Sequence, residues 1–168
     1  MSTLTGGMPA MTYLPANKEI RDLLGDLLGK EVEVRPGPPF AITNHNPASV
    51  AVYVDDSLVV RAVICFDLAL SAYAGAALAL VPPARAEQAV EERDLPEQIT
   101  ETLHEVLNIA AALFNADGAP HMKLHAMHPA GTPTPPDVRA RSQVLGRRID
   151  LWVDVAGYGT GRLAVVLT

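Results

Sequence analysis

The chain has 168 residues, of which 49% are hydrophobic and 19% are charged, and its formal net charge is −6. This length suits one domain with a single core, and the composition is that of a folded protein and not of a disordered one. The negative charge argues against nucleic-acid binding, because no basic cluster longer than Arg147-Arg148 is present to neutralise phosphates.

Membrane insertion and secretion are not expected either. The longest apolar stretch, residues 68–81, is shorter than the roughly 20 apolar residues that cross a bilayer. The N-terminus lacks a basic segment followed by an apolar run, and the single cysteine, Cys65, has no partner for an internal disulfide. We therefore expect a cytoplasmic protein.

The first part of the chain predicts a leader, a helix and a strand. Residues 1–16 show no apolar periodicity and are expected to form a mobile leader before a single domain over residues 17–168. Apolar residues then recur at helical spacing from 17 to 28, with Asn17 and Gly29 as the expected caps. Residues 31–35 alternate between polar and apolar side chains and predict a strand.

A hairpin and a buried helix are expected next. Residues 49–54 and 58–66 are rich in β-branched side chains and flank a turn-forming Asp-Asp-Ser sequence. The second strand is almost wholly apolar, which favours a central position in a sheet. Asp67 is expected to cap the Ala- and Leu-rich helix over residues 68–81.

The longest predicted helix follows a charged connector at residues 84–94. Asp94 and Glu97 resemble a capping box, so this helix is expected from residue 95 to about residue 114. Its apolar residues fall on one stripe and its polar residues on another. The stripe expected to face the core comprises Ile99, Leu103, Val106, Leu107, Ala110, Leu113 and Phe114, and the outward stripe comprises Glu97, Glu101, Glu105, Asn108 and Ala112.

Three further strands complete the prediction. Residues 121–127 and 148–155 alternate strictly, and a Gly-rich turn joins the latter to a last strand over residues 162–168. Between them, residues 128–147 form a Pro-rich loop followed by a short helix or irregular connector. The order of elements predicts an α+β domain, with a largely antiparallel sheet of about six strands and two or three long helices on one face.

The outward stripe of the long helix is the leading candidate for function. Glu105 and Asn108 are three residues apart and therefore adjacent on the helix surface, so they can reach one external molecule together. Asparagine is less favourable than alanine in a helix by roughly half a kcal/mol. Taken alone, however, Glu-x-x-Asn arises by chance in roughly a few of every ten chains of this length, and a solvated face is the simpler interpretation.

Other motifs predict structure and not chemistry. His121 and His125 would share a strand face about 13 Å apart, and His128 would point to the other face, so a metal site is not expected. The glycines of residues 157–161 lie between two strands, where a hairpin turn is expected and not a dinucleotide-binding loop. Cys65 lies in the most apolar strand and is expected to be a buried, unreactive thiol.

The position of Glu-x-x-Asn within the chain is more specific. An outward Glu-x-x-Asn on a long helix, after a hairpin and an Ala-rich helix and before a strand and a final hairpin, resembles the CheC/CheX chemotaxis phosphatase family. The resemblance covers most of residues 17–168. Members of the CheC branch carry two such helices and this chain shows one, so it is more similar to CheX.

This resemblance implies hydrolysis of the aspartyl phosphate of a CheY-like response regulator. Asn108 would orient the attacking water, and Glu105 would pair with the active-site lysine of the regulator. The Mg²⁺ ion would belong to the regulator, so no cofactor or metal of the chain's own is expected. Phosphoryl transfer asks the protein mainly to position the nucleophile, which a carboxamide can do.

The resemblance also has departures at flanking positions. Glu101 stands four residues before the glutamate, where the family usually has Asp or Ser, and Ala112 stands four residues after the asparagine in place of a frequent glycine. Both are expected to contact the partner. The family's downstream proline is not at its usual spacing. CheX-like proteins dimerise through their sheets, and the last strand, residues 162–168, is expected to offer an edge for this.

Two alternatives remain open at this point. The chain could be a non-catalytic module of the same fold that binds a response regulator or a flagellar switch protein without changing the lifetime of a phosphate. A metal hydrolase built on the histidines is a distant third hypothesis.

Overall fold

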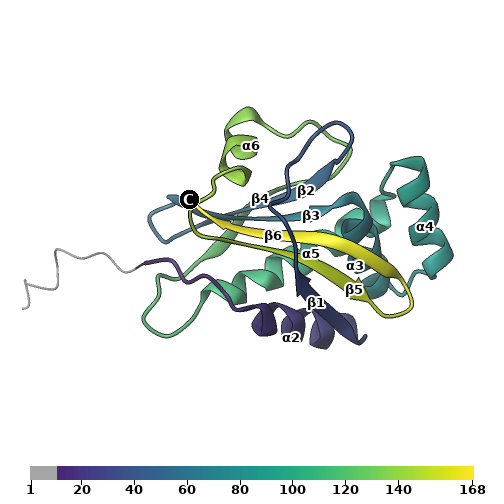
Figure 1. The fold of residues 1–168 in the computed structure, drawn as a ribbon, viewed down its shortest axis with the longest axis horizontal. Helices are drawn as coiled ribbons and strands as arrows, with labels where there is room; N and C mark the ends of the chain where they lie inside the picture. The colour runs from purple at the N-terminus through teal and green to yellow at the C-terminus, as the bar shows by residue number, and fades with distance from the viewer. Residues whose placement is uncertain (1–10) are drawn as a thin grey trace, which may run out of the picture.

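The computed structural model describes residues 11–168, which form a six-stranded antiparallel sheet with helices packed against it (Figure 1). The predicted α+β class is confirmed. In chain order the elements are α2 (Asn17–Leu28), β1 (Val32–Pro36), β2 (Ala48–Val54), β3 (Val60–Asp67), α3 (Leu68–Ala79), α4 (Pro83–Glu92), α5 (Glu97–Ile109), the 3₁₀-helix η1 (Ala110–Phe114), β4 (Lys123–His128), α6 (Pro136–Ser142), β5 (Arg148–Val155) and β6 (Gly159–Leu167).

The strand order β1-β5-β6-β3-β2-β4 places β3 and β6 in the middle of the sheet. Their pairing runs from Ala62 opposite Leu167 to Phe66 opposite Leu163. The central position predicted for residues 58–66 is therefore confirmed. The expectation that the last strand offers a sheet edge is wrong, because β6 is hydrogen-bonded on both sides, and the edge strands are β1 and β4.

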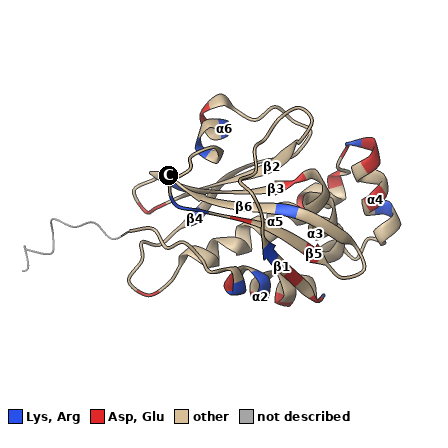
Figure 2. Ribbon diagram, in the orientation of Figure 1, with Lys and Arg blue, Asp and Glu red and all other residues tan. Residues whose placement is uncertain are grey.

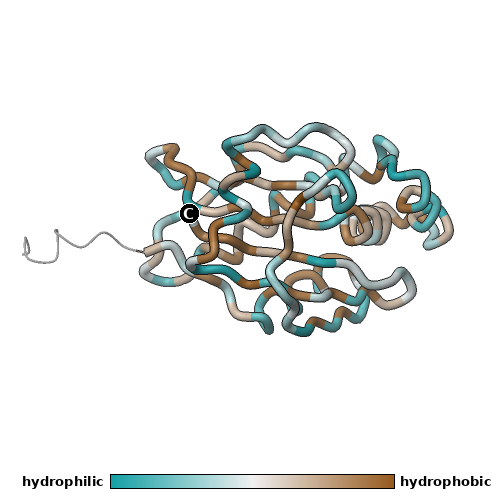
Figure 3. The backbone as a smooth tube through the Cα atoms, turned by 45° about the horizontal axis from the view of Figure 1, so that its top comes forward, coloured by the Kyte–Doolittle hydropathy of each residue, from teal (hydrophilic) through white to brown (hydrophobic). Residues whose placement is uncertain are grey.

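The main core lies between one face of the sheet and the helices α2, α3 and α5, while α4 packs on α3. Figure 3 shows hydrophobic residues gathered along the inner strands, and Figure 2 shows charged residues on the outer helices α2 and α4. The small side chains of α3 allow it to be buried around most of its circumference. Burial on this scale is the main force that stabilises a domain of this size.

The predicted packing of the long helices on one face is confirmed, and the short helix α6 lies on the other face. A second apolar cluster lies on the opposite face of the sheet, where the loop at residues 37–47 and α6 cover it. Phe40 and Ile42 from the loop and Val138 from α6 pack on inward side chains of β2, β3 and β6. The Pro-rich sequence of these segments has no apolar periodicity, so their packing on the second face of the sheet could not be predicted from it.

A buried ion pair fastens this second cover to the sheet. Arg148 and Asp150 lie two residues apart on β5, with Nε 2.8 Å from Oδ2 and side chains only 7% and 6% exposed. The Asp150 carboxylate also accepts a hydrogen bond from the backbone N–H of Phe40 at 3.0 Å. Arg148 donates to the backbone carbonyls of Ser142 and Val144. The pair thus links the strand to both segments that cover the outer face.

Aromatic and arginine side chains extend this cover along the sheet. The Arg162 guanidinium lies 4.7 Å from the ring centroid of Trp152 and 5.4 Å from that of Phe40. It also donates a hydrogen bond to the Pro38 carbonyl. Cation–π contacts of this kind contribute about 0.5–2 kcal/mol according to burial. The first part of the loop, around Pro38 and Phe40, is therefore held against the sheet.

Two of the helix caps predicted from the sequence, Asp67 and Gly29, are observed. Asp67 accepts a hydrogen bond from the Leu70 backbone N–H at 2.8 Å, and Gly29 adopts φ 64° after α2. The predicted caps Asn17 and Asp94 are wrong. The N-cap of α2 is Ala16, and α5 begins after Pro96 without a side-chain cap, because proline already fixes a backbone angle compatible with a helix start.

The expected leader lies partly outside the described residues, which begin at residue 11. Residues 11–16 have no regular secondary structure, yet Pro15 is buried and Leu14 packs against the core. Contacts with the domain therefore begin before the expected boundary at residue 17. Within residues 11–168, no helix combines the length and the apolar character needed to cross a membrane.

We expect Arg148→Ala to lower the free energy of unfolding by about 3–5 kcal/mol, because Asp150 would keep a buried charge without its partner. Urea titration followed by circular dichroism measures this change. The neighbouring exposed Arg147→Ala serves as the matched control, with an expected change within about 0.5 kcal/mol. Equal effects of the two substitutions would contradict the role given to the buried pair.

Candidate functional site

The helix α5 carries the outward stripe that the sequence predicted. Its inward residues Ile99, Leu103, Val106 and Leu107 are at most 1% exposed. This burial fixes the rotation of the helix, because turning it would expose a whole apolar stripe. The predicted phase of α5 is therefore confirmed, although the regular helix ends at Ile109 and not near residue 114.

The four residues singled out from the sequence, Glu101, Glu105, Asn108 and Ala112, are all exposed. Glu101 and Glu105 are one turn apart, and Glu105 and Asn108 are adjacent across the next turn. Among the described residues, no ion pair involves either glutamate. The carboxylate of Glu105 and the carboxamide of Asn108 thus face outward from one helix, open to another molecule.

The structure adds His104 to this surface, a residue that the sequence reasoning missed. His104 is exposed and is four residues before Asn108, so the two are surface neighbours. It also lines an open groove of about 600 Å³ with Glu97, Thr100 and Glu101 of α5. Leu95, Met127 and Pro129 complete the lining. The helical spacing of His104 from Asn108 was visible in the sequence, but the groove also depends on distant residues at the end of β4 and directly after it.

The backbone tightens from an α-helix to a 3₁₀-helix directly after Ile109. A 3₁₀-helix turns about 20° more per residue than an α-helix. Ala112 is therefore rotated away from the position that a continued α-helix would give it, although it stays exposed. Ile109, which is 39% exposed, lies beside Asn108 where the helix ends.

A buried tyrosine anchors the end of α5 that carries Asn108. The Tyr53 hydroxyl, from β2, donates a hydrogen bond of 2.6 Å to the backbone carbonyl of Leu107. Carbonyls in the last turn of a helix lack regular partners within it. The Tyr53 ring also packs on Phe114 with centroids 5.1 Å apart. The residue before Asn108 is thus tied directly to the sheet, a contact between distant residues that no local pattern predicts.

The other end of α5 is fixed by a close crossing with α3. A Cβ atom added to Gly75 would lie 2.5 Å from the carbonyl oxygen of Ile99, nearer than real Cβ contacts come. Thr102 donates a hydrogen bond of 2.6 Å to the Gly75 carbonyl at this crossing. Only glycine at position 75 allows the two helices to approach so closely.

The remaining sequence motifs behave as structural elements. The strand predicted over residues 121–127 is observed as β4 from Lys123 to His128, and exposure alternates from residue 121 to residue 126 as the sequence predicted. A register shift in the pairing of β4 with β2 leaves His125 without an opposite residue. His121 lies 3.4 Å from Asp56, and the described residues contain no group of three potential metal ligands. The Gly-rich segment forms the turn between β5 and β6, as predicted.

Cys65 is buried in β3, as expected from the apolar sequence around it. Burial raises the pKa of its thiol to about 12, and the nearby Arg148 guanidinium opposes this shift only in part. Since the thiolate and not the thiol is the nucleophile, this cysteine is not suited to catalysis.

Removal of the Tyr53 hydroxyl tests the anchor of α5. We expect Tyr53→Phe to lower the free energy of unfolding by about 1–3 kcal/mol, because the buried Leu107 carbonyl loses its partner. Urea titration measures the change, and Tyr73→Phe on α3 is the control, expected to be neutral within about 0.5 kcal/mol. A neutral Tyr53→Phe would mean that the hydrogen bond does not hold the helix end.

The raised pKa of Cys65 predicts slow labelling in the folded protein. At pH 8, four units below about 12, roughly one thiol in ten thousand is ionised, and burial further restricts access. Ellman's reagent should react fully only after addition of denaturant. Glutathione is the control for reagent activity, and rapid stoichiometric labelling in native buffer would show that the thiol is accessible.

Comparison with known proteins connects this arrangement to solved structures. No model of a known family and no curated protein matches the sequence. The FliM middle domain from Vibrio alginolyticus aligns with a TM-score of 0.55 and 14% identity, over 89% of this chain and 86% of that chain. The chemotaxis protein CheX from Vibrio vulnificus aligns with a TM-score of 0.50 and 14% identity, over 90% and 95%.

A CheC-like superfamily protein from Shewanella sp. PV-4 aligns with a TM-score of 0.51 and 12% identity, over 90% of this chain and 93% of that chain. Identities this low carry the fold and not the roles of individual residues. The three alignments cover 89–90% of this chain and 86–95% of the other chains. The chain therefore has the CheC/CheX-type fold, which it shares with the FliM middle domain.

Proposed function

We propose that this chain is a phosphatase for the aspartyl phosphate of a CheY-like response regulator in chemotaxis or two-component signalling. The observation that carries the proposal is the pair formed by Glu105 and Asn108, exposed together on α5 of a CheC/CheX-type fold. A pair that enters the active site of another protein has to stand outside its own core. The burial of the opposite face of α5 meets this requirement.

Asn108 is the proposed positioning group for water. Its carboxamide oxygen accepts a hydrogen bond from a water molecule and holds it in line with the bond between phosphorus and the aspartyl oxygen of the regulator. The water oxygen bonds to phosphorus, the aspartate leaves as a carboxylate, and inorganic phosphate is released. An acyl phosphate is already activated, so orientation of the nucleophile is the main contribution asked of this chain.

Glu105 is proposed to pair with the active-site lysine of the regulator. Because this carboxylate is one turn of helix from Asn108, the ion pair would place the carboxamide over the phosphoryl group. Mg²⁺ would be bound by the regulator, so this chain would supply no cofactor. Glu101, Ala112 and the groove beside His104 are proposed as further contacts with the regulator. The proposed reaction would take place in the cytoplasm.

A homodimer is proposed through sheet edges, with β1 or β4 in place of the central β6. Both strands leave one side of their backbone unpaired within the sheet. β1 is short and carries Glu33 and Arg35, while β4 contains the register shift at His125. β1 pairs with β5 without a register shift, whereas β4 has one in its pairing with β2. β1 is therefore the better candidate for pairing with a strand of a second copy.

A second candidate function is binding without catalysis. The observation that favours it is the alignment with the FliM middle domain, at a TM-score of 0.55. In this case the chain would bind a response regulator or a flagellar switch protein and leave the lifetime of the aspartyl phosphate unchanged. The two functions share a surface and differ in what Asn108 does.

Phosphate release from phosphorylated candidate regulators of the same cell distinguishes the two functions. We expect the wild-type chain to accelerate release from its cognate regulator, and Asn108→Ala to lose about 100-fold or more of this acceleration through loss of an oriented transition-state contact. Regulator binding, measured by fluorescence anisotropy, should change little. Glu105→Gln should instead weaken binding, because the ion pair with the lysine is lost.

Gln98→Ala is the matched control, since it removes an exposed carboxamide from the same helix about 15 Å from Asn108 at 1.5 Å per residue. It should leave phosphate release unchanged. Binding of a regulator with an unaltered phosphate lifetime would favour the non-catalytic module, and acceleration that survives Asn108→Ala would remove the proposed mechanism.

A further inference from the structure

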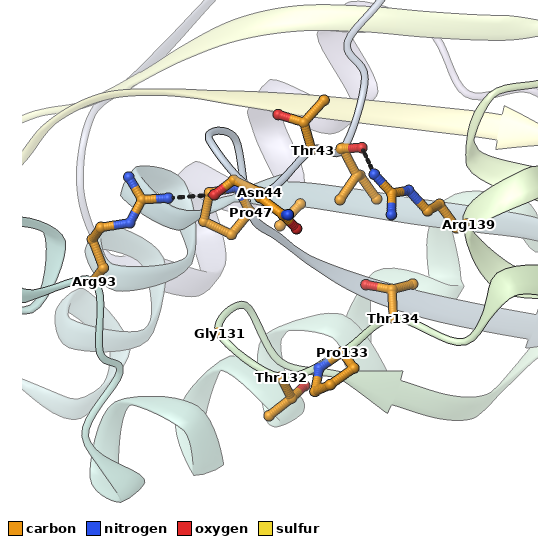
Figure 4. Close-up of a pocket in the computed structure, with 11 residues that line it drawn as sticks. Thr43, Asn44, Pro47, Arg93, Gly131, Thr132, Pro133, Thr134 and Arg139 are labelled. Carbon is orange, nitrogen blue, oxygen red and sulfur yellow. Dashed lines mark hydrogen bonds between the residues drawn. The ribbon is translucent and has the colours of Figure 1, made fainter.

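A cavity of about 430 Å³ lies away from Glu105 and Asn108, at the end of the sheet where β2 begins and β4 ends. Figure 4 shows how segments distant in sequence meet there. Its volume is within the range of about 300–1,000 Å³ found for small-molecule sites. It is lined by Ile42, Thr43, Asn44, Pro47, Ala48, Arg93, Gly131, Thr132, Pro133, Thr134 and Arg139.

Two arginines enter this cavity from different elements. Arg93 follows the end of α4 and Arg139 belongs to α6, and Figure 4 places their side chains on opposite sides of the cavity. Each is held by one hydrogen bond to the same loop. Arg93 donates to the Asn44 carbonyl at 2.7 Å, and Arg139 donates to the Ile42 carbonyl at 2.8 Å. A guanidinium has five N–H donors, so each arginine keeps donors for a ligand.

The charge of the cavity is positive in a chain whose net charge is −6. No acidic residue is among its lining residues, and within residues 11–168 neither Arg93 nor Arg139 forms an ion pair. Two positive groups that share a cavity without a counterion favour the binding of an anion.

Neutral donors add to this preference. The Thr43 hydroxyl oxygen accepts a hydrogen bond from the Asn46 backbone N–H at 3.0 Å, which leaves its proton free to be donated. Thr134 contributes a second hydroxyl from the facing loop. Guanidinium forks and hydroxyls together are the groups that bind phosphate and carboxylate oxygens in proteins.

We propose that this cavity binds a small molecule with two anionic groups, one for each arginine, in which the groups are phosphates or carboxylates. Arg93 and Arg139 clamp the two ends, and the threonine hydroxyls of the two loops donate to oxygens between them. Since the ligand bridges the loop at residues 37–47 and α6, its binding also stabilises the cover on the outer face of the sheet. This site is independent of the proposed phosphatase pair.

Isothermal titration calorimetry of the full chain tests the site, with pyrophosphate as the phosphate probe and citrate as the carboxylate probe, at low ionic strength. At least one probe should bind with one-to-one stoichiometry, and the preferred probe identifies the chemical class of the ligand. Arg93→Gln and Arg139→Gln should each weaken binding at least tenfold. Arg85→Gln, which removes an exposed arginine of α4 outside the cavity, should change it less than twofold.

A substitution that adds a carboxylate separates ligand binding from a loss of loop structure. Thr134→Glu places a negative group in the cavity, on the side of Arg139, and alters neither residue of the hydrogen bonds that the arginines donate to Asn44 and Ile42. We expect it to abolish binding of both probes and to raise the thermal unfolding temperature, because the new carboxylate takes the place of the ligand. Failure of both probes to bind the wild-type chain, equal weakening by Arg85→Gln, or undiminished binding to Thr134→Glu would overturn the proposal.

Discussion

The position of α5 depends on its crossing with α3 at Gly75, where the backbone of one helix meets the backbone of the other. A Cβ atom there would stand 2.5 Å from the Ile99 carbonyl oxygen, so even alanine would force the helices apart. Because interiors are closely packed, such a shift would be transmitted along the helix. The crossing therefore sets where Glu105 and Asn108 lie, although it is about two turns away from them.

The contacts at the two ends of α5 make its outward face rigid. Thr102 joins the first half of the helix to α3, and Tyr53 joins the last turn to β2. A helix held in this way can present a carboxamide in a defined direction, which a mobile loop could not do at the same cost in conformational entropy. The position of the outward residues of α5 is thus fixed by residues such as Thr102 and Tyr53, which contact α3 and α5 and not a partner.

Patterns within single elements could be predicted from the sequence, whereas contacts between distant elements could not. The inward residues of α5 follow a helical period, and the strand at residues 148–155 is observed as β5 with those bounds. The place of β6 inside the sheet depends on its pairing with both β5 and β3. That choice is made by long-range packing, which a single strand's alternation does not encode.

The same division applies to the candidate site. Glu105 and Asn108 could be placed on one exposed face because their spacing is a property of the helix itself. The hydroxyl of Tyr53 on the Leu107 carbonyl and the groove beside His104 bring together residues more than twenty positions apart. The arginine-lined cavity is a further case, since Arg93 and Arg139 are charged residues in segments without periodicity, and only the folded chain brings them to one cavity.

Fold and proposed activity draw on different residues of the same helix, and this makes them separable. The inward side chains of α5 stabilise the domain by their burial, while Glu105 and Asn108 are exposed, and substitutions at such positions usually change stability by less than about 0.5 kcal/mol. A shared fold can thus be kept at 12–14% identity while the outward residues change. The inward and outward residues of α5 alternate along the same helix and point to opposite sides of it. An outward carboxamide can therefore be gained or lost without a change in the side chains that pack in the core.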